Sequence, residues 1–110
     1  MTRPPLSVTK TDDGIHVLTF DREGSSANVF DRATFAALEG ALDEVSADGG
    51  ARALVFASAK RSIFIAGADI HEISSAGSDS ELASFLEAGQ KAMQRVADLP
   101  IVTVAAIHGA

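Results

Sequence analysis

The segment Phe64–Ile70, which reads Phe-Ile-Ala-Gly-Ala-Asp-Ile, contains the residue types best suited to binding a ligand through the backbone. Three small residues at its centre leave room for a ligand to approach the main chain closely: Ala66, Gly67 and Ala68. Asp69 can cap a short helix that follows, and the N–H groups at such a turn are available to an anion or a developing oxyanion. From these residues alone, an ordinary strand-to-helix turn is the commoner explanation.

Titratable side chains near this segment predict neither a metal site nor a catalytic acid–base pair. Asp69, His71 and Glu72 follow no recognised zinc spacing and have no evident fourth ligand, so we predict no metal. Two carboxylate pairs invite an acid–base assignment, Asp69 with Glu72 and Glu81 with Glu87. Carboxylates on helices are usually solvated, however, so we assign none of them to catalysis.

Other motifs and the composition narrow the function classes. His16, which we place in an edge-like strand, and His108 have no partner evident in the sequence. No Ser-His-Asp pattern, P-loop or dinucleotide-binding glycine motif is present.

The 110 residues include no cysteine, which excludes disulfides and thiolate nucleophiles. The formal net charge of -6 opposes nucleic acid binding. A phosphorylated ligand would need local basic residues, for which Arg22, Lys60 and Arg61 are candidates unless they are simply solvated.

Strands and helices must position the segment, and the spacing of apolar residues predicts them. The predicted strands are Leu6–Lys10, Ile15–Phe20, Ala53–Ala57 and Ile101–Ile107, the last two being buried. The predicted helices run from an Asp31 cap to about Ala47, and from the capping box Ser78-x-x-Glu81 to Pro100. This order of elements predicts an α/β layered fold with right-handed crossovers.

Local patterns place these elements against a core. In the first helix, apolar residues recur at spacings of three and four: Phe35, Leu38, Leu42 and Val45. In the second helix, the predicted apolar face contains Gly89 and consists of Leu82, Phe85, Leu86, Met93 and Val96. Between the first two strands, Asp12-Asp13-Gly14 predicts a hairpin turn, because Asp and Gly tolerate positive φ.

The two ends of the sequence lead to further expectations. No apolar run follows Met1, so we see no signal peptide and expect a cytoplasmic protein. The longest apolar run, Ile101–Ile107, is too short to span a bilayer. A buried strand needs cover on both faces, so we expect residues 1–110 to be one domain truncated before its end. The alternative is a complete small domain whose final strand is central.

Three segments resemble the crotonase (enoyl-CoA hydratase/isomerase) superfamily, in the right order and over nearly the whole chain. Phe64–Ile70 is similar to that family's Phe-x-Ala-Gly-Ala-Asp-Ile signature, and Ala27–Phe30 is similar to its first ligand-contacting loop. Residues 100–110, which end in His-Gly-Ala, resemble the strand that leads into its glycine-rich segment. Ile65 and this final motif are most similar to the hydratase portion of the bacterial multifunctional fatty acid oxidation complex.

The resemblance implies a crotonase-like ββα spiral fold of the α/β class, of which residues 1–110 are the N-terminal half only. It implies that the backbone N–H of Ala68 is one of two oxyanion-hole donors to a thioester carbonyl. The substrate-binding residues that it implies are Ser26, Asn28, Ala66, Gly67, Ala68, Asp69 and Ile70. It places the second donor and the catalytic glutamate pair beyond Ala110. His71 stands where the family often has a lysine that contacts phosphate.

The activity that the resemblance implies is reversible hydration of 2-enoyl-CoA to 3-hydroxyacyl-CoA in fatty acid β-oxidation, with acyl-CoA as the substrate and no cofactor. One alternative is an enoyl-CoA isomerase or another crotonase reaction, because one fold hosts many chemistries. An alternative of another class is a non-catalytic acyl-CoA-binding or interaction module. The family also implies a homo-oligomer or a multienzyme complex for the full-length protein, without nucleic acid and without a membrane span.

Overall fold

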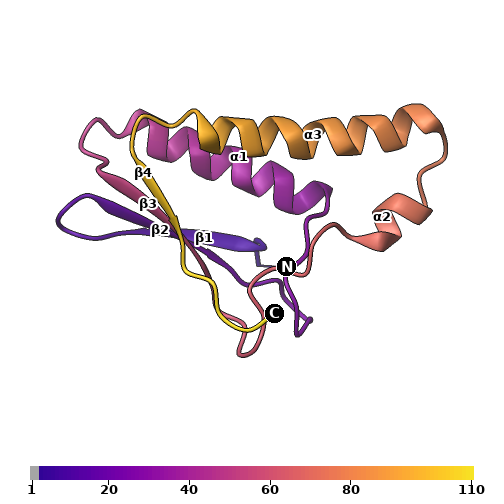
Figure 1. The fold of residues 1–110 in the computed structure, drawn as a ribbon, viewed down its shortest axis with the longest axis horizontal. Helices are drawn as coiled ribbons and strands as arrows, with labels where there is room; N and C mark the ends of the chain where they lie inside the picture. The colour runs from indigo at the N-terminus through magenta and orange to yellow at the C-terminus, as the bar shows by residue number, and fades with distance from the viewer. Residues whose placement is uncertain (1–2) are drawn as a thin grey trace.

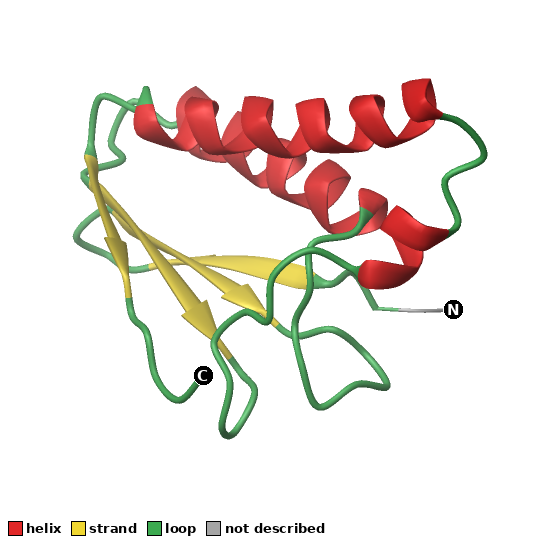
Figure 2. Cartoon of the chain, turned by 45° about the vertical axis from the view of Figure 1, so that its right-hand side comes forward, coloured by secondary structure: helices red, strands yellow, loops and turns green. Residues whose placement is uncertain are grey.

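The computed structural model describes residues 3–110, which form a four-stranded sheet with two long helices across one face (Figures 1 and 2). The elements in chain order are β1 (Leu6–Lys10), β2 (Ile15–Phe20), α1 (Arg32–Ala47), β3 (Ala53–Ser58), α2 (Ile70–Ser74), α3 (Asp79–Ala97) and β4 (Val102–Ala105). The strands lie in the order β1-β2-β3-β4, with β1 antiparallel to β2 and the other two pairs parallel. The predicted α/β succession of elements is confirmed.

The hairpin between β1 and β2 depends on a glycine, as the sequence predicts. Gly14 has a φ of 87°, which side chains other than hydrogen rarely allow. A Cβ atom at Gly14 would also lie 2.6 Å from the carbonyl oxygen of Gly50. The carbonyl of Gly14 accepts a hydrogen bond of 2.9 Å from the N–H of Arg52. The turn therefore also ties the hairpin to the segment that leads into β3.

Capping side chains start all three helices. Asp31 Oδ1 accepts from the N–H of Thr34 at 2.7 Å, and this bond starts α1 at the predicted position. Ser78 Oγ accepts from the N–H of Glu81 at 3.2 Å at the start of α3. The Glu81 carboxylate accepts from the N–H of Gly77, one residue before the cap. The predicted capping box is therefore present with its return bond shifted by one residue.

The core lies between the sheet and the helices α1 and α3. Its buried apolar residues are Leu6, Leu18, Phe20, Phe35, Leu38, Ala41, Leu42, Val45, Leu54, Phe85 and Ala92. A row of phenylalanine rings crosses it, with centroid separations of 5.9 Å for Phe20 and Phe30, 5.3 Å for Phe30 and Phe35, and 5.5 Å for Phe35 and Phe85. This row connects the sheet to both long helices.

Close packing of α1 against α3 requires the glycine at position 89. A Cβ atom built on Gly89 would lie 2.8 Å from Phe35 Cζ, inside van der Waals contact. Overpacking against the ring costs about 1–3 kcal/mol, whereas alanine in a helix gains up to about 1 kcal/mol, so we expect Gly89→Ala to lower the free energy of unfolding by up to about 2 kcal/mol. Urea unfolding followed by circular dichroism measures this change.

A matched control is Gly40→Ala in α1, where the added methyl group meets no atom within 4 Å. That variant is expected to stabilise the chain by up to about 1 kcal/mol, since alanine favours helix and loses less backbone entropy. Equal stabilities for the two variants would contradict the close contact between α1 and α3.

The prediction that Ile101–Ile107 is a buried strand is wrong. All four residues of β4 are exposed, with 64% of Val102 and 48% of Val104 accessible, and Ile107 after them is 68% exposed. β4 is the last strand of the sheet and pairs only with β3, and neither long helix packs extensively against it within residues 3–110, so its side chains stay uncovered. In residues 3–110 nothing pairs with its outer edge. In the same residues, no helix has both the length and the apolar character needed to cross a bilayer.

The predicted apolar face of α3 is only partly buried. Phe85 is 3% exposed and faces the core, but Leu86 and Met93 are 49% and 44% exposed. These two side chains border a groove beside the segment Phe64–Ile70, which is described below. The spacing predicted the helix correctly but assigned too much of its surface to the core.

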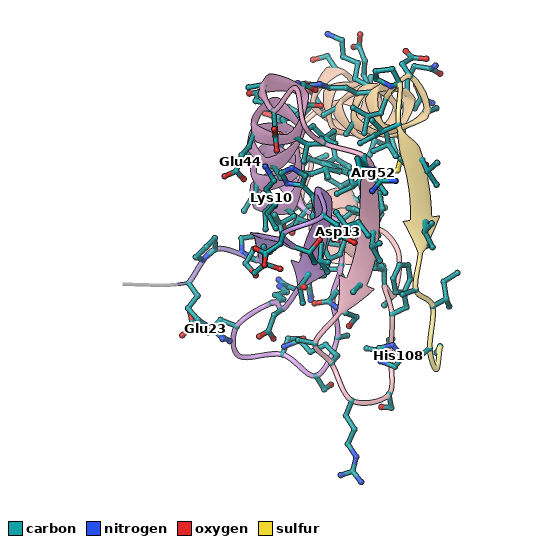
Figure 3. All side chains as sticks on the ribbon, turned by 90° about the vertical axis from the view of Figure 1, so that its left-hand side faces the viewer. Lys10, Asp13, Glu23, Glu44, Arg52 and His108 are labelled. Carbon is teal, nitrogen blue, oxygen red and sulfur yellow. The ribbon has the colours of Figure 1, made fainter. Side chains whose placement is uncertain are left out.

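His16 lies inside the sheet, which corrects its placement in an edge-like strand. β2 pairs with β1 on one side and with β3 on the other, and His16 is 3% exposed. Its Nε2 lies 2.9 Å from Asp48 Oδ2, the residue that ends α1, whereas its Nδ1 has no partner among residues 3–110. Lys10 Nζ lies 2.5 Å from the same carboxylate oxygen. Figure 3 shows Lys10 near the hairpin, away from His108.

The cluster of Lys10, His16 and Asp48 predicts that the stability of the fold falls at acid pH. The hydrogen bond from Lys10, followed by those from the Gly50 N–H and His16, holds the pKa of Asp48 well below its usual range. A lowered carboxyl pKa contributes stability that is complete above about pH 4 and is lost as the pH falls towards the folded pKa. We expect Asp48→Asn to lower the urea midpoint at pH 7 and to weaken its decline between about pH 5 and 2. An unchanged decline would exclude Asp48 as a source of the acid dependence.

Candidate functional site

The three segments singled out in the sequence meet at the carboxyl ends of the parallel strands. Residues 21–30 follow β2, residues 59–69 follow β3 and residues 106–110 follow β4. Because parallel strands end at the same edge of a sheet, their loops form a common surface there, which is where ligands bind in open α/β sheets. An isolated parallel bridge between Phe30 and Ala68 joins the first two loops.

The N–H of Ala68 faces away from this bridge. Phe30 donates to the carbonyl of Gly67 at 2.8 Å, and the N–H of Asp69 donates to the carbonyl of Phe30 at 2.8 Å. In a parallel bridge of this kind the N–H and C=O of the intervening residue point to the opposite side. Among residues 3–110, the N–H of Ala68 has no hydrogen-bond acceptor, and Ala68 itself is exposed. It is therefore a fixed donor that is available to a ligand.

The backbone on either side of this donor is open. Ala66, Gly67 and Ala68 are all exposed, and Gly67 has a φ of 103°. No atom lies within 4 Å of the position that a Cβ at Gly67 would occupy. The positive φ, rather than crowding, accounts for glycine at this position. A ligand can thus approach the main chain at Gly67 closely.

Asp69 is buried and serves the fold, while its neighbours are accessible. It is 8% exposed, and its Oδ1 accepts from the N–H of His71 at 2.9 Å as the N-cap of α2. The short helix that was predicted after it is confirmed. Ile70 is 72% exposed and His71 is exposed, so both lie on the accessible surface. Contact of Asp69 or Ile70 with substrate stays a prediction.

Asn28 directs its side chain inward. It is 2% exposed, and its Nδ2 donates to Ser58 Oγ at 2.8 Å and to the carbonyl of Phe64 at 2.9 Å. Its Oδ1 accepts from the N–H of Arg22 at 3.0 Å, and its own carbonyl accepts from the N–H of Ala66 at 2.8 Å. Asn28 thus holds the segment Phe64–Ile70 from within. Ser26 is exposed, and its contact with substrate also stays a prediction.

Two of the three basic candidates are engaged in the fold. The side chain of Lys60 is 12% exposed, and its Nζ lies 2.5 Å from the carbonyl of Arg22 and 3.0 Å from Asp21 Oδ1. Its hydrogen bond is the main cause that lowers the pKa of Asp21. Arg22 lies between two carboxylates, as described below. Arg61 is exposed and forms no ion pair within residues 3–110, so of the three candidates it is the one available to a phosphate.

Two apolar cavities flank the exposed segment. One, of about 530 Å³, is lined by Phe30, Ala68, Phe85, Leu86, Gly89 and Met93 among others. The second, of about 420 Å³, includes Phe30, Phe64, Ile65, Gly67 and Met93 in its lining. Phe30 and Met93 line both cavities; the sequence placed Phe30 in a ligand-contacting loop but assigned Met93 only to the apolar face of a helix. The available signal was Met93, because a flexible apolar side chain on a helix stripe also suits a binding surface.

The last residues of the chain support the same segment from the other side. The N–H of Phe64 donates to the carbonyl of Ala110 at 2.6 Å, and the N–H of Ala110 donates to the carbonyl of Ser62 at 3.2 Å. His108, which Figure 3 labels, has a partner that the sequence did not reveal, because its Nε2 lies 2.7 Å from the carbonyl of Lys60. In residues 3–110, no three histidine, aspartate or glutamate side chains are placed to hold a metal ion.

Comparisons with known proteins agree on one family. A family model described as "Enoyl-CoA hydratase/isomerase" matches residues 10–110. The fatty acid oxidation complex subunit alpha of Aliivibrio fischeri is 40% identical over 102 residues, which are 92% of this chain and 15% of that protein. Solved enoyl-CoA hydratases from Bacillus anthracis and Mycobacterium smegmatis superimpose with TM-scores of 0.85 and 0.84 at 24% and 25% identity. In each case the match covers 96% of this chain and 40% of the other. The chain thus spans well under half the length of these relatives.

Proposed function

Because this chain belongs to the enoyl-CoA hydratase/isomerase family, we propose that it supplies the thioester-binding part of an acyl-CoA active site. The N–H of Ala68 donates a hydrogen bond to the thioester carbonyl oxygen during reversible hydration of a 2-enoyl-CoA to a 3-hydroxyacyl-CoA. The observation that carries this proposal is a fixed, exposed N–H with no acceptor among residues 3–110, beside two apolar cavities.

The chemistry explains why such a donor is useful. When water adds to the double bond, negative charge moves onto the thioester oxygen and forms an enolate. An N–H already aimed at that oxygen stabilises the charge as it develops, and one such donor is worth about 10²–10³ in rate. The proton transfers need an acid–base pair, and the family's glutamate pair and second donor match no position among these 110 residues. We therefore expect the isolated chain to bind acyl-CoA weakly and not to hydrate it.

The apolar cavities suit the acyl chain of this substrate class, whereas the net charge does not suit its phosphates. An acyl chain is apolar, and the side chains of Phe30 and Met93 border both cavities next to the donor. The net charge of -6 opposes the phosphates of CoA, and Arg61 is the accessible cation closest in sequence to the segment. The apolar cavities and the unfavourable net charge together support an affinity that comes mainly from contacts of this chain with the acyl thioester, and less from contacts with the CoA phosphates.

The relatives guide the wider assignment. The Aliivibrio fischeri relative is named as a subunit of a fatty acid oxidation complex, which supports hydration in fatty acid β-oxidation over the other reactions of the family. The same name supports membership of a multienzyme complex, with a homo-oligomer as the alternative, and a cytoplasmic location. An enoyl-CoA isomerase needs the same enolate and the same donor, so product analysis with 2-enoyl-CoA and 3-enoyl-CoA substrates separates the two reactions.

Butyryl-CoA labelled with ¹³C at its carbonyl tests the proposed contact directly. On saturation with the ¹⁵N-labelled chain, the carbonyl resonance should move downfield, because hydrogen bonding polarises the C=O bond, and the amide resonance of Ala68 should move with it. CoA without an acyl group is the control, and it should leave the Ala68 amide in place. If butyryl-CoA binds but the chemical shift of its carbonyl carbon does not change, Ala68 is not the donor.

A further inference from the structure

One arginine links the two strands of the bridge that carries the Ala68 donor. Arg22 Nη2 lies 3.6 Å from Asp31 Oδ2 and 3.6 Å from Asp69 Oδ2. Both carboxylates are largely buried, with 17% and 10% of their side chains exposed, whereas the arginine side chain is 36% exposed. The guanidinium thus lies between two acidic groups that the fold removes from most of the solvent.

The positions of these two aspartates in the chain explain why a cation is needed. Asp31 directly follows Phe30 and Asp69 directly follows Ala68, and Phe30 and Ala68 are partners in the parallel bridge. The two aspartates are therefore neighbours across it. Two carboxylates at adjacent positions repel each other, and the repulsion grows as they leave water. A cation between them removes the repulsion and attracts both.

Both aspartates also have a fixed task, so neither can turn away to relieve the repulsion. Asp31 caps α1 through the N–H of Thr34, and Asp69 caps α2 through the N–H of His71. Arg22 is held in place as well, because its N–H donates to Asn28 Oδ1 at 3.0 Å and its carbonyl accepts from Lys60 Nζ at 2.5 Å.

We propose that Arg22 is a positioning residue, which fixes the direction of the Ala68 N–H by clamping Asp31 to Asp69 across the bridge. The inference rests on the proposed function for its consequence in catalysis, but the clamp itself is a property of the free chain. It also replaces the assignment of Arg22 as a phosphate ligand, since its guanidinium serves two carboxylates of the fold.

Amide hydrogen exchange tests the clamp without any ligand. The N–H groups of Asp69 and His71 are both hydrogen-bonded here, so their exchange reports local opening of the bridge. Arg22→Met should accelerate exchange at both amides by about tenfold or more, with little change at amides of β2. Arg52→Met is the matched control, because Arg52 lies at the opposite end of the sheet, just before β3, and it should change neither amide.

A second variant separates a clamp from general destabilisation. Asparagine is as good an N-cap as aspartate but carries no charge, so Asp31→Asn keeps the cap of α1 and removes the repulsion between the two carboxylates. In the Arg22→Met/Asp31→Asn double variant, exchange at Asp69 and His71 should return to within about threefold of the wild-type rate. No recovery in the double variant, or equal acceleration throughout the sheet in Arg22→Met, would overturn the proposal.

The labelled butyryl-CoA then connects the clamp to the donor. In Arg22→Met the carbonyl resonance of the bound thioester should lose most of its downfield shift, and Arg52→Met should retain it. If Arg22→Met weakens the binding of CoA without an acyl group and leaves the exchange of Asp69 and His71 unchanged, Arg22 is a phosphate ligand and the clamp is wrong. If the wild-type chain binds no acyl-CoA, the proposed function fails, while the exchange pattern still decides the role of Arg22.

Discussion

Ala68→Pro is expected to reduce kcat by about 10²-fold or more, in a form of the protein that hydrates crotonyl-CoA. Proline has no backbone N–H, so the substitution removes the proposed donor itself. The replacement of the alanine methyl group by the proline ring is the smaller change. In residues 3–110 the N–H of Ala68 has no acceptor, so no internal hydrogen bond is lost. The loss of crotonyl-CoA absorbance measures the rate, and circular dichroism checks the fold.

Ala68→Gly is the matched control, because it keeps the N–H and removes only the side chain. It should fold and lose less than about tenfold in kcat, through a less precise position of the donor. The proline ring also occupies space near the ligand, so acyl-CoA affinity must be measured beside the rate. A folded proline variant with near-normal kcat would remove Ala68 from the mechanism.

Asn28→Ala is expected to lower the free energy of unfolding by about 2–4 kcal/mol, which is large for a single substitution. The buried amide makes three hydrogen bonds, to Ser58, to the carbonyl of Phe64 and from the N–H of Arg22. Truncation leaves these groups without their partner at a site that is 2% exposed. Urea unfolding gives the free energy, and the exchange of the Ala66 amide reports the loosened segment.

Ser26→Ala provides the comparison, since Ser26 is the neighbouring residue that the sequence also assigned to substrate binding. It is exposed, so its truncation should change stability by less than about 0.5 kcal/mol. An effect of Asn28→Ala as small as that of Ser26→Ala would show that the buried amide does not hold the segment. An effect of Ser26→Ala on acyl-CoA affinity alone would support its contact with the ligand.

Local sequence signals predicted most of the fold. The hairpin at Asp12-Asp13-Gly14, the caps at Asp31 and Ser78, and the apolar spacing of α1 each act within one or two turns of chain, and all are present. The family assigned from three short segments is confirmed by the comparisons, and the solved relatives confirm the fold. The small residues around Ala68 are exposed, as a segment that a ligand can approach requires, while binding of a ligand there stays a prediction.

The features that the sequence did not reveal depend on contacts between distant residues. His16 meets Asp48 across 32 positions, and Arg22 reaches Asp69 only because two loops pair through one bridge. A polar side chain such as Asn28 looks the same in the sequence whether it faces a ligand or the interior. The composition of Ile101–Ile107 predicts a buried strand because it shows which environment the residues prefer, whereas burial itself depends on what packs against the strand.

The contacts of residues 108–110 have a consequence for the order in which the site forms during synthesis. Ser62 and Phe64 bond to Ala110, a residue that is synthesised after all four strands β1 to β4. We therefore expect a nascent chain to pack the core between β1 to β4 and the long helices before the segment at Phe64 becomes ordered. A chain ending at Ile107 should retain slow amide exchange in β2 and show faster exchange at Phe64. Equally slow exchange at Phe64 in both chains would show that Asn28 alone sets the final geometry.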